Sequence, residues 1–116
     1  MSDATEPGRI FQVVGRFSLR PGAEATWDAA FQERIEQAAS APGWLGVAAW
    51  APVAEPSERV VVGRWRSKAD YETWALTESY LRTKVTLDSC QTGAPDIEWF
   101  RSVTILDAGE AERQTP

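Results

Sequence analysis

The chain has 116 residues, enough for one hydrophobic core and too few for two. Its composition, 43% hydrophobic and 25% charged, is that of a folded protein and excludes a disordered chain. Twelve basic and seventeen acidic side chains give a net charge of −5, the wrong sign for binding nucleic acid or an anionic membrane surface. No apolar run approaches the ~20 residues of a membrane span, and the first residues lack the basic start and apolar stretch of a signal peptide. We therefore expect a cytoplasmic protein.

Two residue types are missing from the sequence, and a third occurs once. There is no histidine and no asparagine, and the single cysteine is Cys90. Without histidine, Ser-His-Asp and Cys-His catalysis are excluded, and the commonest haem and zinc ligand is absent. Cys90 cannot form an internal disulfide, and we expect it to be a small buried residue. We therefore expect no metal site and no cofactor.

The first part of the chain predicts three strands and one helix. Residues 11–19 alternate between apolar and polar side chains, the pattern of a strand with one buried face. Apolar residues at helical spacing within 23–39 predict an amphipathic helix, which Ala-Pro-Gly at 41–43 ends. Residues 44–50 predict the second strand, and residues 58–66 predict the third after a proline-containing loop.

The remainder predicts a second helix and a last strand. Ser67, followed three residues later by Asp70, resembles a capping box and predicts the start of the helix. We expect this helix to bend or break near Thr77. The Gly-Ala-Pro segment at 93–95 ends it, and residues 97–106 predict the last strand.

The predicted order is β-α-β-β-α-β, which is the ferredoxin-like arrangement of an α+β protein with an antiparallel sheet. We expect a single domain at residues 10–106, with flexible ends at 1–9 and 107–116. Two helices on one face of the sheet leave the other face uncovered, and its side chains are expected to include Val14, Val47 and Val60. Because these are too apolar for water, we expect a second copy to pack there as a homodimer.

Glycines and tryptophans together indicate a pocket. Glycine inside a strand costs stability and packs nothing, so it marks a cavity, a bulge or a close backbone approach. Gly63 shares a strand face with Trp65, and the missing side chain leaves room beside the indole. Together Gly15, Gly46 and Gly63 favour a flat, aromatic-lined slot for a planar polycyclic ligand, whereas Trp27 is expected to fill the core.

Three stretches of sequence carry a family resemblance. Leu-Arg-Pro-Gly follows the first strand, Ala-Pro-Gly-Trp-Leu-Gly opens the second, and Trp65-x-Ser67-x-x-x-Tyr71-x-x-Trp74 leads from the third strand into a helix. Over roughly residues 10–106 the chain resembles the antibiotic biosynthesis monooxygenase family of dimeric α+β barrels. The resemblance implies a ferredoxin-like fold and a dimer.

Cofactor-independent members of that family oxidise aromatic polyketides such as anthrones to quinones. The resemblance matches their tryptophan to Trp65 and their helix tyrosine to Tyr71, and it places their strand asparagine at Val61. It therefore implies that Trp65 and Tyr71 are the catalytic pair.

The haem-degrading branch of the family offers a second comparison. Its helix tryptophan matches Trp74, while its asparagine falls on Gly15 and its haem-ligating histidine falls on Lys84. A protonated lysine cannot replace imidazole at haem iron, so this chemistry is not expected.

The polar candidates for the site are a tyrosine and several cations. Tyr71 can donate or accept a proton in a dry pocket, although an ordinary pKa of ~10 makes it a poor base, or it is simply a half-buried tyrosine with a bonded hydroxyl. Four cations could hold phenolate or enolate oxygens, or could be solvated: Arg64, Arg66, Arg82 and Lys84. The residues expected to bind substrate are Trp74, Gly63, Val61, Gly15, Arg82 and Lys84.

The leading hypothesis from the sequence is a tailoring enzyme of aromatic polyketide (antibiotic) biosynthesis. It would use molecular oxygen, without a cofactor, to convert an anthrone- or naphthol-like ring to a quinone. One alternative is a polyketide cyclase or isomerase on the same fold, which needs enolisation but no oxygen. Another is a non-catalytic binder of planar aromatic compounds.

Overall fold

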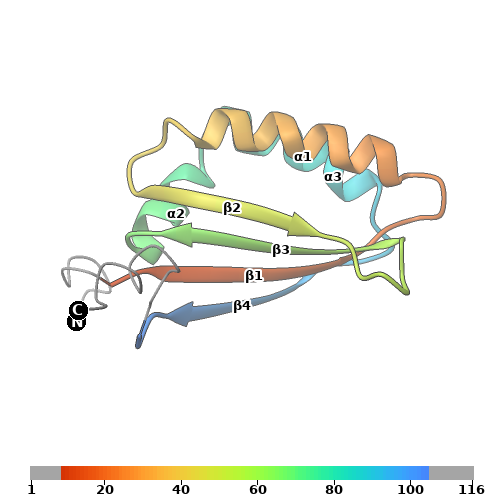
Figure 1. The fold of residues 1–116 in the computed structure, drawn as a ribbon. Coiled ribbons are helices and arrows are strands. Elements are labelled where there is room, and N and C mark those ends of the chain that lie inside the picture. Colours follow the sequence, from red (N-terminus) through yellow and green to blue (C-terminus); the bar gives the residue numbers. More distant parts are fainter. Residues whose placement is uncertain (1–8, 105–116) are drawn as a thin grey trace.

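The structure is a computed structural model and describes residues 9–104. The elements in this range are β1 (Phe11–Ser18), α1 (Glu24–Ala38), β2 (Trp44–Trp50), β3 (Glu58–Trp65), α2 (Lys68–Trp74), α3 (Glu78–Ser89) and β4 (Asp96–Arg101). This order confirms the predicted α+β, ferredoxin-like fold, with the second helix divided into α2 and α3 (Figure 1). The ends expected to be flexible, 1–9 and 107–116, lie outside the described residues except for Arg9. No helix within the described range is long and apolar enough to cross a membrane.

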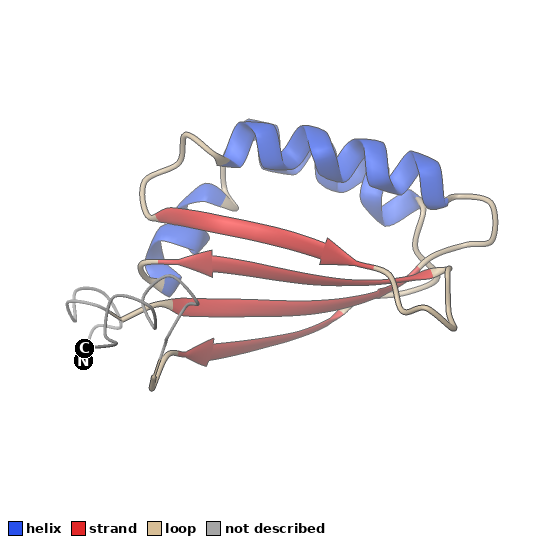
Figure 2. Ribbon diagram, in the orientation of Figure 1, coloured by secondary structure: helices blue, strands red, loops and turns tan. Residues whose placement is uncertain are grey.

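The four strands form one antiparallel sheet in the order β2-β3-β1-β4. Figure 2 shows that the helices lie on one side of this sheet and that no helix covers the other side. The central strands β1 and β3 pair Val13 with Gly63 and Phe11 with Trp65. This register brings the inward-facing side chains of the two central strands together beneath the helices.

Side-chain caps begin both C-terminal helices. The Ser67 hydroxyl accepts a hydrogen bond from the Asp70 backbone N–H at 3.0 Å, as the sequence predicted. Thr77 has extended backbone between α2 and α3, and its hydroxyl accepts from the Tyr80 N–H at 3.4 Å. The predicted break near Thr77 is therefore confirmed, because the N-cap of a helix cannot itself be helical.

Two groups of buried side chains fill the space between sheet and helices. The first contains Leu19, Trp27, Ala30, Leu87 and Cys90. The second contains Val13, Ala38, Trp65 and Trp74. Trp27 is 1% exposed and donates its indole N–H to Gln91 Oε1 at 3.1 Å, so the predicted core role of Trp27 is confirmed, as is the burial of Cys90.

Val47 does not lie on the uncovered face, as the sequence analysis expected. The pairing of β2 with β3 shifts between Trp44 and Gly46, and this bulge places Val47 opposite Gly63 on the helix-covered face. One extra residue in a strand moves every following side chain to the other face of the sheet. Val14 and Val60 do lie on the uncovered face, because their sequence neighbours point under the helices.

The last strand is shorter than predicted. β4 ends at Arg101, residues 102–104 are not in a strand, and residues 105–106 lie outside the described range. β4 pairs only with β1, whose first residue, Phe11, lies opposite Arg101. After one more backbone bond, from Ser102 N to Ile10 O at 2.7 Å, the partner strand has ended.

Candidate active site

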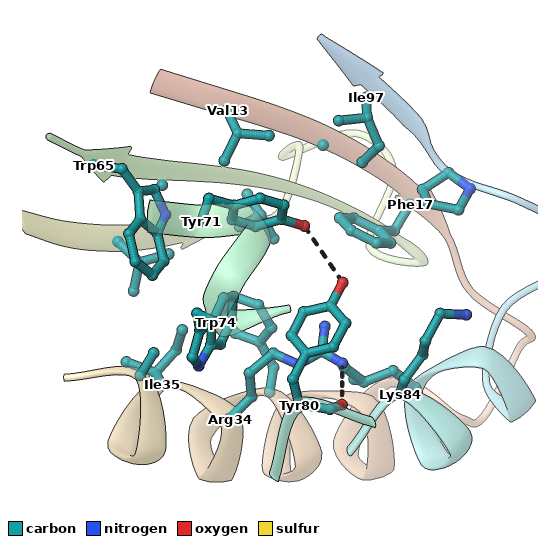
Figure 3. A pocket seen from close by; sticks show the side chains of 18 of the residues that line it. Val13, Phe17, Arg34, Ile35, Trp65, Tyr71, Trp74, Tyr80, Lys84 and Ile97 are labelled. Atoms are coloured by element: carbon teal, nitrogen blue, oxygen red, sulfur yellow. Dashed lines mark hydrogen bonds between the residues drawn. The ribbon is translucent and has the colours of Figure 1, made fainter. Parts of the chain in front are cut away.

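A cavity of about 210 Å³ lies between the inner face of the sheet and the three helices (Figure 3). Its sheet side is formed by aliphatic and aromatic side chains and by strand glycines, and its helix side by aromatic and charged residues. An apolar cavity with a few polar groups on one wall is the usual form of a small-molecule site.

Aromatic rings form one end of the cavity. Trp65 leaves the end of β3, and the cap at Ser67 starts α2 so that Tyr71 and Trp74 lie one turn apart beside it. Tyr71 contacts Trp65 edge-on at 5.7 Å between ring centroids and Trp99 at 5.1 Å. These edge-to-face contacts fix the orientation of the Tyr71 ring.

The Tyr71 hydroxyl is hydrogen-bonded to the hydroxyl of Tyr80, with the two oxygens 3.3 Å apart. Figure 3 shows both hydroxyl groups turned toward each other in the cavity. Burial, together with the bond from Tyr80, raises the pKa of Tyr71 above its ordinary value of 10.0. Tyr71 is therefore neutral at physiological pH, and its hydroxyl can donate a hydrogen bond.

The side chain of Arg34 extends from α1 to the ring of Tyr80. Its guanidinium carbon lies 3.9 Å from the centroid of the Tyr80 ring. Nε donates to the Thr83 hydroxyl at 2.9 Å, and Nη2 donates to the Tyr80 backbone oxygen at 3.0 Å. Burial lowers the pKa of Arg34 from its ordinary value of 12.5, and the guanidinium remains the group least able to lose its charge in proteins.

Two glycines on the sheet side of the cavity lie close to neighbouring side chains. A Cβ atom on Gly15 would lie 2.8 Å from Phe17 Cε2 and 3.0 Å from Ile97 Cδ1. A Cβ on Gly63 would lie 3.2 Å from Val13 Cγ1 and 3.7 Å from Trp65 Nε1, so Val13 already fills much of the room beside the indole. Both glycines line the cavity, so a larger residue at either position would reduce its volume.

Most of the residues predicted for the site do line the cavity: Gly15, Val61, Gly63, Trp65, Tyr71, Trp74 and Lys84. Arg82 does not. The cavity-facing side of α3 carries Tyr80, Lys84, Leu87 and Asp88, and Arg82 is rotated by about 200° from Tyr80. Arg82 is exposed on the opposite side of the helix, so the structure does not bring it together with the other predicted site residues.

Of the other three predicted cations, Lys84 lines the cavity and the two arginines do not. Arg64 and Arg66 are exposed and are absent from the cavity wall. Lys84 lines the cavity but is half exposed, and its ammonium group pairs with Asp88 Oδ2 at 2.6 Å.

Sequence analysis missed Arg34 and Tyr80 as site residues. The signal for Arg34 was present, because Trp27, Phe31, Arg34 and Ala38 follow helical spacing along the buried side of α1. A charged residue in an otherwise apolar helical stripe is costly and therefore informative. Tyr80 was recognised only as part of an apolar pattern. The direction in which its side chain points depends on the break at Thr77.

The fold and the site together define a ferredoxin-like α+β protein with an aromatic-walled cavity between its sheet and its helices. Residues 10–85 match the family model described as "Antibiotic biosynthesis monooxygenase". The chain belongs to this family, which confirms the resemblance seen in the sequence. No curated protein matches the chain.

Several solved structures share this fold. SnoaB, a cofactor-independent oxygenase from Streptomyces nogalater, is 17% identical with a TM-score of 0.76, covering 85% of this chain and 98% of that one. A putative antibiotic biosynthesis monooxygenase from Caulobacter crescentus is 20% identical with a TM-score of 0.76, covering 82% and 91%. One from Nitrosomonas europaea is 14% identical with a TM-score of 0.77, covering 81% and 90%. At these identities the comparisons establish the fold alone.

Proposed function

We propose that the protein is a cofactor-independent monooxygenase that converts an electron-rich aromatic ring, of the anthrone or naphthol type, to a quinone. The observation that carries the proposal is the neutral Tyr71 hydroxyl inside an aromatic-walled cavity. Family membership and the likeness to a cofactor-independent oxygenase agree with it. The aromatic rings that line the cavity, among them Trp65 and Trp74, suit a planar ring system.

The proposed reaction balances with oxygen as the only co-substrate. An anthrone CH₂ group loses a proton to solvent, and the resulting carbanion is delocalised onto the ring oxygen as an enolate. The carbanion transfers electrons to O₂ and forms a carbon–oxygen bond. The resulting peroxide anion takes up a proton from solvent. Loss of the second proton from that carbon, with cleavage of the O–O bond and departure of hydroxide, leaves the new carbonyl, and the hydroxide and the proton form one molecule of water.

In this scheme the protein stabilises charge and excludes water. Tyr71 donates a hydrogen bond to the substrate oxygen as negative charge develops there. Trp65 and Trp74 form the apolar wall against which the ring lies, and a dry site strengthens each electrostatic contact.

Oxygen uptake with a simple hydroxyanthrone, using metal-stripped and flavin-free protein, tests the proposal. We expect one O₂ consumed per quinone formed, above the rate in buffer. Removing one oxyanion donor typically costs 10²–10³ in kcat, so Tyr71→Phe is expected to lose activity by about 100-fold. Trp65→Phe is expected to lower turnover by misplacing the ring. The matched control is Arg82→Gln, which lies away from the cavity and should keep wild-type turnover.

Each rival function has its own outcome. Product formation without oxygen would replace the oxygenase with a cyclase or isomerase. Tryptophan quenching by the compound, with no turnover, would indicate a binder. Unchanged turnover in both Tyr71→Phe and Trp65→Phe would remove these residues from the reaction.

A further inference from the structure

All titratable groups that face the cavity come from its helical side. Arg34 comes from α1, Tyr71 from α2, and Tyr80, Lys84 and Asp88 from α3, while the lining residues of the four strands include none. The cavity therefore has one polar wall and one apolar wall. A planar ligand lying flat on the sheet would turn an edge toward the polar wall.

Arg34 is the cation of this wall that forms no direct ion pair with a carboxylate of the described residues. Lys84 pairs with Asp88, and no carboxylate within residues 9–104 forms an ion pair with the Arg34 guanidinium. The Asp88 carboxylate attracts Arg34 only from beyond ion-pair distance. A half-buried cation without a counter-ion in direct contact carries a desolvation cost that an anionic ligand would offset.

Hydrogen bonds hold the Arg34 guanidinium in place without using all of its N–H donors. Of its five N–H groups, one is bonded to Thr83 and one to the Tyr80 carbonyl, which leaves three. Thr83 is itself buried and donates to the Tyr80 carbonyl at 3.0 Å. Figure 3 shows Arg34 extending from α1 between Trp74 and Tyr80.

The tyrosine pair adds a further donor beside this cation. One hydroxyl proton is used in the bond between Tyr71 and Tyr80, and the other is left for a ligand. A charged guanidinium and a free phenolic O–H next to each other form a site for an anionic oxygen.

We infer that Arg34, with the hydroxyl pair of Tyr71 and Tyr80, is an oxyanion-binding site, and that the cavity selects hydroxylated polycyclic aromatics bound as their phenolate or enolate. The inference deepens the proposed function, on which it rests for the choice of an aromatic ligand. It assigns to Arg34 the role that the sequence analysis gave to the cations of β3 and α3.

The test uses 2-hydroxyanthraquinone, whose phenolate absorbs at longer wavelength than its phenol and which is already a quinone. Its pKa is measured by absorbance, free and bound to the full-length protein. We expect a bound pKa lower by at least about one unit, which is a tenfold preference for the anion. Arg34→Gln should abolish this shift, and Arg34→Lys should restore part of it because the charge returns without the planar fork.

Two controls separate this role from a structural one. Unsubstituted anthraquinone has no oxyanion, so it should bind wild type and Arg34→Gln with similar affinity. Arg82→Gln should leave the bound pKa within a few tenths of a unit of wild type, because Arg82 is an exposed cation of α3 that does not line the cavity.

If Arg34→Gln does not fold, the affinities of the two compounds for the wild-type protein test the inference. Above the free pKa of the probe, 2-hydroxyanthraquinone should bind at least about tenfold more tightly than anthraquinone. Equal affinities, an unshifted bound pKa, or a shift that persists in folded Arg34→Gln would overturn the inference.

The inference and the proposed function fail in distinguishable ways. A lowered bound pKa without oxygen uptake would leave the oxyanion site standing and remove the oxygenase. Oxygen uptake without a lowered bound pKa would leave the oxygenase standing and remove the oxyanion site.

Discussion

The hydroxyl oxygens of Tyr71 and Tyr80 lie 3.3 Å apart, although the two residues belong to different helices. In one continuous helix, residues nine positions apart are separated by about two and a half turns and lie on opposite faces. The break at Thr77 turns α3 relative to α2 and brings both side chains into one cavity. The geometry of the polar wall therefore depends on a helix end and its cap.

Loss of the Thr77 hydroxyl is expected to weaken this junction. The hydroxyl accepts from the Tyr80 N–H and donates to the Trp74 carbonyl at 2.7 Å. Replacing a threonine N-cap with alanine costs about 1 kcal/mol, so Thr77→Ala should lower the free energy of unfolding by this amount. Urea denaturation measures it. Thr77→Ser keeps the hydroxyl and is the control, and equal losses in both variants would contradict the capping role.

Two buried tryptophans should respond differently to the same substitution. The Trp27 indole N–H donates to Gln91, whereas the Trp74 indole N–H is buried and has no hydrogen-bond partner among residues 9–104. Tryptophan to phenylalanine removes equal volume at both sites, but Trp27→Phe leaves Gln91 Oε1 unpaired and Trp74→Phe removes an unpaired donor. An unpaired buried group costs about 1–3 kcal/mol, so Trp27→Phe should be the more destabilising by about that difference.

Chemical denaturation of both variants checks this prediction. Because replacing both partners of a hydrogen bond by apolar groups is nearly neutral, Gln91→Met should recover part of the loss when combined with Trp27→Phe. A Trp74→Phe variant as unstable as Trp27→Phe would show that packing, not the hydrogen bond, sets the cost.

The neutral state of Tyr71 predicts a loss of stability in alkali. Burial raises the pKa of Tyr71 above 10.0, so above about pH 10 the unfolded chain loses this proton while the folded protein keeps it. The contribution of the Tyr71 proton to the free energy of unfolding is complete below pH 10. It is lost as pH rises, with a slope of at most about 1.4 kcal/mol per pH unit. The free energy of unfolding of wild type should therefore fall more steeply between pH 9 and 11 than that of Tyr71→Phe. Parallel slopes would mean that Tyr71 ionises normally in the folded protein.

Local signals in the sequence were enough for most of the fold. Pro-Gly corners and the hydroxyl cap at Ser67 act within a few residues, so β2 begins and ends where the pattern predicted. The Trp65, Tyr71 and Trp74 cluster was also predictable, because a capped helix directly after a strand fixes the spacing of its aromatic residues.

The errors arose where the outcome depends on a distant partner. The β2 bulge that turns Val47 inward is defined by pairing with β3, and the end of β4 is defined by where β1 begins. Whether Arg34 or Arg82 faces the cavity depends on how each helix is rotated against the sheet. Helical spacing along α1 carried that information for Arg34, whereas the phase of α3 depended on the break at Thr77.

We propose that a second copy of the chain covers the outer face of the sheet. Val14 and Val62 lie opposite each other on the two central strands, and no helix of the described residues covers them (Figure 1). Further apolar area comes from Trp50 and Phe100, which are 62% and 45% exposed. A face with apolar side chains at its centre can pack on its own copy across a two-fold axis, which removes this surface from water.

Light scattering and sedimentation of Val62→Arg test the dimer, since two buried arginines near the axis would repel each other and remain unpaired. We expect wild type at twice the chain mass and Val62→Arg at the chain mass. Val85→Arg is the matched control, because Val85 is 73% exposed on a helix. The substitution introduces the same charge away from the sheet. It should remain dimeric. A wild type that sediments as a monomer would contradict the proposal, and a monomeric Val85→Arg would move the interface from the sheet to the helices.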